Sequence, residues 1–346
     1  MSINSLSGSV RQSSQQGGTD NTQVTHKKSS WLTRATGMRE ISLIVIIAAI
    51  FIAMSFASPY FLTWANMKAM LLSFSVEGIV VVGMTMLLIV GGIDLAVGAV
   101  MCLAMVMAAK LFVLGVNPWL ASLISIAMCS LIGWMMGKCV TKIGLHHFIV
   151  TLAFMGLARG ASMIITQGTP ISLFTLPPEF KFIGQGTLFG VPFSIIIFFV
   201  VIIISDFLLR NATAFRKIFY TGSNEKAAQY SGVRTDRIKL MVTVLCSGLC
   251  GLAGIIYMSK FGAATPNFGV GLELNIIAAA VIGGASLNGG EGSVFGAILG
   301  IALLSLVSSS LMLLDVSVYW QDFIKGLILL VAVAIDHVVH QRKKLS

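Results

Sequence analysis

The chain has 346 residues, of which 56% are hydrophobic and 10% are charged, and its mean hydropathy is +0.93. Soluble domains carry about 25% charged residues, so this composition excludes an ordinary soluble protein and places the chain among membrane proteins. The net charge of +10 does not indicate nucleic-acid binding, because the basic residues lie in short segments beside apolar runs. The five cysteines lie in or beside the same runs, and no set of histidines completes a metal site, so we expect buried side chains.

Residues 1–40 form the first predicted segment, a cytoplasmic tail that is rich in Ser, Gln, Gly and Thr over most of its length. Such a composition buries too little apolar surface to fold, so we expect the tail to be disordered. The first apolar run begins only at Ile41, and no small-residue cleavage site directly follows it. We therefore interpret this run as a retained helix and not as a secretory signal.

Residues 41–338 are predicted to form one transmembrane domain. A membrane-spanning helix needs about 20 apolar residues, and ten runs are candidates: 41–57, 70–90, 95–114, 119–137, 148–166, 190–209, 241–258, 274–284, 293–314 and 322–338. The eighth run is too short to span as a regular helix, so it begins earlier or is broken. The sequence predicts an all-α membrane protein with about ten transmembrane helices.

The distribution of basic residues predicts the orientation of these helices. With the N-terminus in the cytoplasm, most of the 23 Lys and Arg residues fall in cytoplasmic segments, including the central loop 210–240 and the basic tail 339–346. Those at the outer side are Lys68, Lys110, Lys181 and Lys260. Cytoplasmic loops carry the excess of positive charge, so we expect both termini in the cytoplasm and an even number of helices. The segments 167–189 and 259–273 are then external loops.

Ionisable side chains inside apolar runs are costly and point to functional or structural polar contacts. Glu77 and Arg159 fall inside predicted helices, and we favour a structural ion pair or inter-helix hydrogen bond over a transport role for them. Lys325 lies close enough to the outer face for its ammonium group to reach the interface. Asp94 follows a glycine pair and is expected to cap the helix that begins at Leu95.

The central loop contains the pattern of a short surface helix. A glycine permits a sharp turn, a Ser-Asn pair can cap the helix start, a glutamate suits the first turn, two alanines favour helix and a second glycine can end it. The residues singled out are Gly222, Asn224, Glu225, Ala227, Ala228 and Gly232. A helix of about two turns is unstable alone in water, so it packs on the membrane surface or in a groove of a cytoplasmic partner.

Two glycine-rich breaks interrupt the apolar pattern, one at 89–98 and one at 281–293, and they echo each other weakly, as in transporters built from internal repeats. Irregular backbone survives at membrane depth only where it is buried in protein or lines a cavity. Translocation-path or gate candidates are Gly91, Gly92, Asp94, Gly283, Gly284, Ser286 and Asn288. The charge distribution puts the 288–292 end on the cytoplasmic side, which favours a glycine-packed helix turn near an inner gate.

Three motifs, in order, resemble the permease subunits of ribose/galactose-type ABC sugar importers: Gly-Gly-Ile-Asp-Leu-x-Val-Gly at 91–98, Gly-x-Asn-Glu-x-Ala-Ala-x-x-x-Gly at 222–232 and Gly-Gly-x-Ser-Leu-x-Gly-Gly-x-Gly-Ser at 283–293. The C-terminal segment 325–336 also fits, and the match runs from about residue 40 to the end. The resemblance implies a membrane-spanning dimer, cytoplasmic ATPase domains, an external solute-binding protein, and residues 222–232 as the helix that contacts the ATPase. The long N-terminal tail and Glu291 depart from the family pattern.

The sequence predicts a multi-pass permease of the bacterial inner membrane that imports a small solute, such as a monosaccharide. No phosphate-binding Gly-x-x-x-x-Gly-Lys-[Ser/Thr] motif is present, so ATP and magnesium are expected on a partner ATPase, and this chain is expected to hold no catalytic residue or cofactor. The alternative is a stand-alone secondary carrier or facilitator that depends on Glu77. Whether the permease dimer pairs identical or related chains stays open.

Overall fold

The computed structural model describes the backbone of residues 29–345 and the side chains of residues 40–334. The expected disorder of residues 1–28 lies outside this range. Helix α1 begins at Ser29, so the part of the expected tail from residue 29 to residue 40 is helical. This corrects the predicted boundary, because residues 29–40 contain no proline and each residue added to an existing helix gains a hydrogen bond without a new nucleus.

Every predicted apolar run coincides with a helix, so the all-α architecture is confirmed. These helices are α1 (Ser29–Ala57), α2 (Trp64–Ile89), α3 (Val97–Val113), α4 (Pro118–Lys138), α5 (His147–Thr166), α7 (Phe193–Asn211), α10 (Thr235–Phe261), α11 (Leu272–Ile282), α12 (Val294–Leu313) and α13 (Val318–Leu345). In the described part of the chain, seven helices are long and apolar enough to cross a membrane, while α3 and α11 are apolar but shorter. The count of about ten spans stays a prediction.

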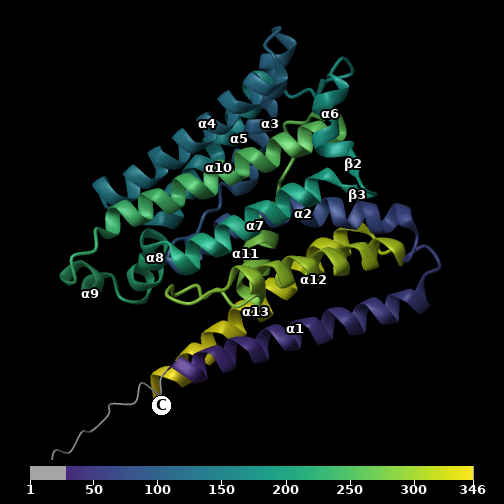
Figure 1. The fold of residues 1–346 in the computed structure, drawn as a ribbon. Helices are drawn as coiled ribbons and strands as arrows, with labels where there is room; N and C mark the ends of the chain where they lie inside the picture. Colours follow the sequence, from purple (N-terminus) through teal and green to yellow (C-terminus); the bar gives the residue numbers. More distant parts are fainter. Residues whose placement is uncertain (1–28, 346) are drawn as a thin grey trace, which may run out of the picture.

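Shorter elements cluster at the two ends of the helix bundle. They are a π-helix (Cys139–Ile143), α6 (Pro178–Gln185), α8 (Thr213–Ser223), α9 (Glu225–Tyr230), and the strands β1 (Ile171–Ser172), β2 (Thr187–Leu188), β3 (Val191–Pro192) and β4 (Ala263–Ala264). Strand β1 pairs with β4 and β2 with β3, both antiparallel. Figure 1 shows α8 and α9 at one end of the bundle and α6, β2 and β3 at the other.

Helices α2 and α10 form the centre of the bundle. Helix α10 packs on α4, α3 and α2, and α12 packs on α11, α2 and α1. The second half of α2 is buried all round, as expected for a helix that is apolar on every face. Small residues allow close approach: a Cβ at Gly254 of α10 would fall on the carbonyl oxygen of Met101 in α3. Four of the cysteines are buried in this core as predicted, and Cys139 is half-buried.

Candidate functional site at the glycine breaks and the central loop

The two glycine-rich breaks are tight turns at helix ends. Helix α2 ends at Ile89, and Gly91 takes a φ of 87°, a conformation that L side chains rarely adopt. Helix α11 ends at Ile282 and is followed by positive φ angles at Gly284, Gly289 and Gly290. Gly283 faces α12 so closely that a Cβ would fall on the carbonyl oxygen of Gly296. Glycine is therefore required for both the turn and the packing.

The end of α8 meets both breaks at one point, which we call the glycine junction (Ile89–Gly91, Gly222–Ser223 and Gly289–Gly290). The amide of Gly290 donates to the carbonyl oxygen of Ile89 at 2.8 Å. A Cβ added to Gly222 would fall on that same oxygen and 2.7 Å from the Gly290 nitrogen, and one added to Gly289 would lie 2.9 Å from the Gly222 oxygen. Three segments that are distant in sequence thus touch backbone to backbone, with no room for a side chain.

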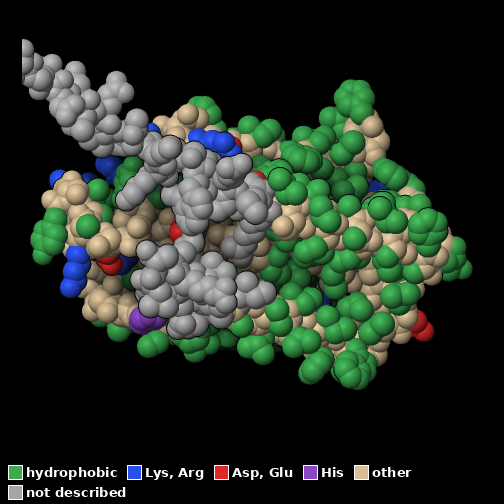
Figure 2. Space-filling view, turned by 90° about the horizontal axis from the view of Figure 1, so that it is seen from below, with side chains coloured by type: hydrophobic (Ala, Val, Ile, Leu, Met, Phe, Trp, Pro, Cys, Tyr) green, Lys and Arg blue, Asp and Glu red, His purple; other side chains and the backbone are tan. Residues whose placement is uncertain are grey.

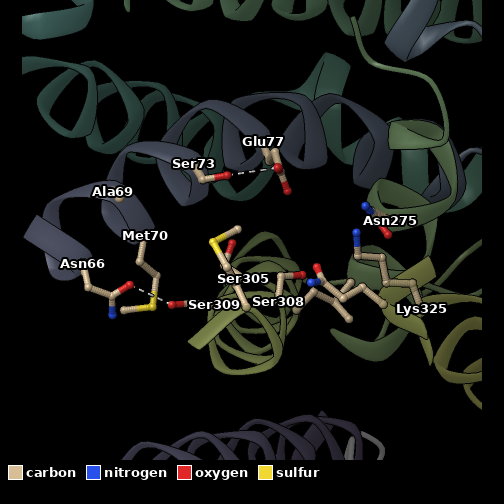
Figure 3. Close-up of a pocket in the computed structure, with 13 residues that line it drawn as sticks. Asn66, Ala69, Met70, Ser73, Glu77, Asn275, Ser305, Ser308, Ser309 and Lys325 are labelled. Atoms are coloured by element: carbon tan, nitrogen blue, oxygen red, sulfur yellow. Dashed lines mark hydrogen bonds between the residues drawn. The ribbon is translucent and has the colours of Figure 1, made fainter. Parts of the chain in front are cut away.

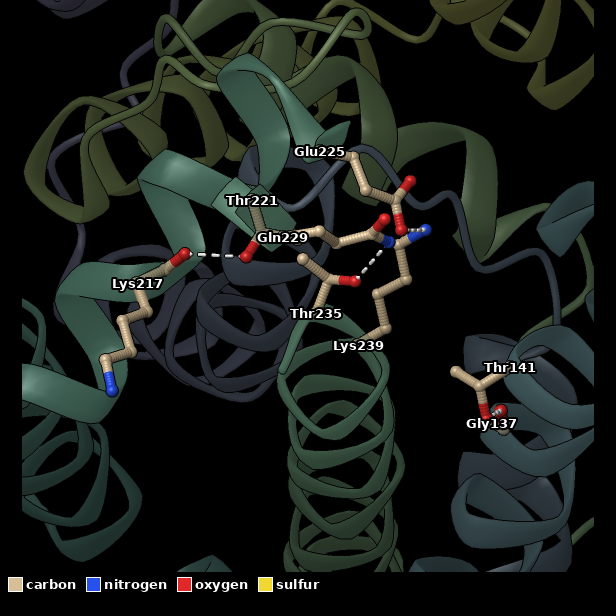
Figure 4. A network of polar contacts seen from close by, with 8 residues as sticks. All are labelled: Gly137, Thr141, Lys217, Thr221, Glu225, Gln229, Thr235 and Lys239. Carbon is tan, nitrogen blue, oxygen red and sulfur yellow. Dashed lines mark hydrogen bonds and ion pairs between the residues drawn. The ribbon is translucent and has the colours of Figure 1, made fainter. Parts of the chain in front are cut away.

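The central loop folds as two helices, α8 and α9, where the sequence pattern indicated a single short one. The side chain of Asn224 accepts a hydrogen bond from the amide of Ala227 at 3.0 Å and so caps α9, as predicted. Glu225 forms an ion pair of 2.6 Å with Lys239 of α10, which ties α9 to the core (Figure 4). Gly232, with a φ of 80°, lies in the turn that follows α9.

Helices α8 and α9 border an open groove of about 470 Å³. Its lining includes Tyr220, Ser223, Ala227 and Val233. Both predicted alanines line the groove, but Ala228 is buried while Ala227 is exposed. Tyr230, three residues further along α9, is 91% exposed and lies outside the lining of the groove. Figure 2 shows Lys and Arg side chains gathered at this end of the molecule.

The comparisons with known proteins identify the family. Residues 66–333 match the family described as branched-chain amino acid transport system / permease component. The chain belongs to this family. It is 37% identical to the ribose import permease protein of Escherichia coli over 309 residues, which cover 89% of this chain and 96% of that protein. It is 33% identical to the D-allose transport system permease protein (86% and 90% covered) and to the L-arabinose transport system permease protein (88% and 92% covered) of the same organism. No solved structure matches.

These matches confirm the family resemblance that the three motifs indicated. The chain is the permease subunit of an ABC import system and is not an enzyme. It is a multi-pass protein of the bacterial cell membrane.

The gate candidates of this permease divide into two groups. Gly91 and Gly92 line a hollow of about 410 Å³ together with His146 and His147. Gly283 and Ser286 are buried in the second turn, where the amide of Asn288 donates to the Ser286 hydroxyl at 3.1 Å. The second break is thus mainly a structural turn, in agreement with the glycine-packed turn that the charge distribution favoured.

Asp94 stabilises the first break from within. Its Oδ1 accepts from the amide of Ala96 at 2.7 Å, and α3 begins at Val97, so the side chain holds the turn before the helix and does not cap a helix starting at Leu95. This corrects the predicted helix start by two positions. The residue is 1% exposed, and its Oδ2 has no hydrogen-bond partner within the described part of the chain.

Glu77 and Arg159 lie apart, and within the described residues neither belongs to an ion pair. Arg159 donates to the carbonyl oxygens of Pro266 at 3.2 Å and Phe268 at 2.5 Å, a structural role as expected. Glu77 accepts from Ser73, one turn earlier on α2, and lines a cavity with Lys325. The sequence interpretation missed this cavity.

The sequence does carry a signal for the cavity in the spacing of polar residues. On α2, Asn66, Ser73 and Glu77 are separated by seven and four positions, which places them on one helix face. On α12, Ser305, Ser308 and Ser309 share a face in the same way. Each set is a short polar stripe on a predominantly apolar helix.

Proposed function

We propose that this permease imports a monosaccharide, with transport driven by a cytoplasmic ATP-binding subunit that docks on α8 and α9. ATP and magnesium bind to that subunit, and the permease holds no cofactor of its own. The solute class is supported by relatives named for ribose, D-allose and L-arabinose that align over more than four fifths of this chain. These three solutes are all monosaccharides.

The groove beside α8 and α9 suits a protein partner. Ala227 presents a small side chain in the groove, and Tyr230, one turn further along α9, presents an exposed ring, a combination that allows close approach and a large buried contact. The Glu225–Lys239 pair and the Asn224 cap hold α9 in place before a partner arrives, which reduces the entropy lost on binding. Basic side chains at this end favour a cytoplasmic location.

The glycine junction would transmit a displacement of the partner subunit to the membrane domain. Because Gly222 touches Ile89 and Gly290 through backbone atoms, a shift of the end of α8 has no flexible side chain to absorb it. Helix α2 ends at the junction, and the loop that follows α11 reaches it. This direct contact between the docking segment and both breaks is the observation that carries the mechanism.

The remaining partners follow from the same orientation. We place both termini in the cytoplasm, because the first turns of α1 and the last turns of α13 lie at the same end of the bundle as α8 and α9 (Figure 1). The opposite end, with α6 and the strand pairs, then receives the external solute-binding protein. About ten helices span the membrane, with α3 and α11 shortened by the glycine breaks, and two permease copies form the pathway.

An arginine at Ala227 tests the docking proposal. The substitution Ala227→Arg fills the groove with a long charged side chain, so we expect the ATP-binding subunit to be lost when the permease is purified from its own membrane. The matched control is Ala214→Arg, at an exposed position of α8 that does not line the groove. Equal recovery of the ATP-binding subunit with both variants would contradict docking at this groove.

A further inference from the structure

A cavity of about 280 Å³, lined by both polar and apolar side chains, lies between α2, α11, α12 and α13, away from the glycine junction. Figure 3 shows the side chains of Glu77, Asn275 and Lys325 directed toward a common space, with Ser305 and Ser308 on the facing surface of α12. Helix α12 carries no charged residue, and α2 carries only Lys68 besides Glu77. Polar groups gathered inside a membrane bundle are costly and mark solute or ion routes.

The hydrogen bonds of the cavity are only partly satisfied. Ser309 donates to Asn66 at 3.1 Å, and Glu77 accepts from Ser73 at 3.2 Å. The hydroxyl of Ser305 is buried and has no hydrogen-bond partner within the described residues. Ser310, five residues further along α12, does not line the cavity. Its hydroxyl donates to the carbonyl oxygen of Leu306 at 2.7 Å, the usual arrangement for a serine in an apolar helix. Ser305 therefore has an unused hydroxyl at the wall of the cavity, which a change of rotamer would turn toward a molecule there.

The position of the cavity along α2 also suits a site for a solute that arrives from outside. Asn66 is near the start of α2 and Glu77 near its middle, roughly 16 Å further along at about 1.5 Å per residue. The other end of α2, at Ile89, is part of the glycine junction. The cavity thus occupies the half of the bundle that is remote from the docking segment, where a solute delivered from outside would arrive first.

We propose that this cavity is a contact site for the transported sugar, with Glu77, Ser305, Ser308, Asn275 and Lys325 as the groups that hydrogen-bond its hydroxyls. This inference rests on the proposed function and names where that function meets its solute. Carboxylate and amide oxygens accept from sugar hydroxyls, ammonium and amide groups donate to them, and serines do both. The volume is slightly below the roughly 300–1,000 Å³ of sites for drug-sized ligands, which suits one monosaccharide.

The lining argues against a branched-chain amino acid as the molecule in this cavity. A carboxylate and an ammonium group could pair with the two charged ends of a free amino acid. Its branched side chain would find apolar contacts at Met70, Leu304 and Met312, but the hydroxyl and amide groups of Ser305, Ser308 and Asn275 would then lack partners. A sugar, with a hydroxyl on most carbons, satisfies the same groups.

Uptake by cells that carry the variant permease with its own partner proteins tests the role of the cavity. We expect Ser308→Ala and Glu77→Gln to lower the maximal uptake of the labelled sugar by about fivefold or more, since the first removes a hydrogen bond to the solute and the second replaces a charged acceptor with a weaker neutral one. The probes are labelled D-ribose, D-allose and L-arabinose. Each variant is then compared with the unmodified permease, using the sugar that the unmodified permease takes up best. Matched controls are Ser310→Ala on α12 and Asp206→Asn on α7, which lie outside the cavity and keep uptake within twofold of the unmodified permease.

A second measurement reports occupancy independently of transport rate. Ser308→Cys places a thiol in the cavity, while the natural cysteines are buried or half-buried. We expect a small membrane-impermeant thiol reagent added outside intact cells to modify it, and the same sugar, but not leucine, to slow the modification at least threefold. Protection by leucine in place of the sugar would overturn the assignment.

The two proposals fail in different ways. If ATP drives uptake and Ala227→Arg abolishes it, but the cavity variants behave like their controls and sugar gives no protection, the cavity inference is wrong and the proposed function stands. If uptake does not depend on ATP and is unchanged by Ala227→Arg, the proposed function is wrong. Protection of Ser308→Cys by sugar would then still support the cavity as a solute site.

Discussion

Gly222 lies against the carbonyl oxygen of Ile89 and the amide of Gly290, at the point where the docking segment meets both glycine breaks. The contact consists of main-chain atoms only, so the smallest possible side chain already disrupts it. Most other glycines at this junction, such as Gly91 and Gly289, have positive φ angles and are needed for the turns themselves. Gly222 is different, because it is helical and is required only for the close approach.

The substitution Gly222→Ala tests this contact. Overlap with backbone cannot be relieved by a rotamer change, so we expect the variant to lose about 1–3 kcal/mol of stability and most of its ATP-driven uptake. The matched control is Gly156→Ala on α5, where an added Cβ meets nothing within 4 Å. That change should keep full uptake and leave the melting temperature equal or slightly raised. Equal melting temperatures for the two variants would contradict the close backbone contact of Gly222 at the glycine junction.

The roles of single residues could be predicted from sequence only where the cause is local. The Asn224 cap depends on neighbours within three positions, so the pattern was sufficient, and the glycine turns were evident for the same reason. The contact of Gly222 with Gly290 joins segments far apart in the chain, and nothing in either motif specifies the other. The cavity around Glu77 was missed because its residues come from four helices whose packing the sequence does not reveal.

At the level of elements, α9 is a helix of six residues that depends on its surroundings. A helix this short does not form alone in water, and its stability comes from the Asn224 cap, the ion pair of Glu225 with Lys239 and the burial of Ala228. The ion pair is partly exposed, with 24% of the Lys239 side chain and 39% of the Glu225 side chain accessible, so it contributes at most about 1 kcal/mol. The cap is the most specific of the three contacts.

Removal of the cap is predicted to loosen α9 and weaken the docking surface. We expect Asn224→Ala to destabilise α9 by about 1 kcal/mol and to reduce the affinity of the ATP-binding subunit by about fivefold. Asn117→Ala provides the control, because Asn117 caps α4 through the amide of Trp119 in the same way. Affinity is measured by titrating the purified permease with the subunit. A similar loss of affinity in both variants would mean that α9 does not form the docking surface.

The extents of the elements were harder to predict than their existence. Each apolar run became a helix, since burial in a membrane bundle leaves the backbone few other ways to satisfy its hydrogen bonds. The N-terminal extension of α1 and the separate helix α8 were not expected, because polar residues continue a helix only where the adjoining structure supports it. Helix α8 does carry a signal, in Phe215, Ile218 and Phe219 at helical spacing between charged residues.

At the scale of the whole molecule, the docking groove and the polar cavity lie toward opposite ends of one bundle, with α2 passing from one region to the other. Asn66 and Glu77 of α2 line the cavity, and Ile89 at its end receives the hydrogen bond from Gly290. A displacement at the docking groove is therefore connected to the solute site through a single helix. This arrangement suits a transporter in which ATP is used on one side and the solute is received on the other.

The central claim is that this permease moves a monosaccharide only when its partner subunit uses ATP. The most direct measurement is accumulation of labelled sugar in proteoliposomes that contain the permease with its co-purified ATP-binding subunit and its binding protein. The account predicts accumulation against a gradient when ATP is present on the side of α8 and α9, and none without ATP or with Ala227→Arg. Equal accumulation without ATP, driven by an ion gradient and abolished by Glu77→Gln, would contradict it and indicate a secondary carrier.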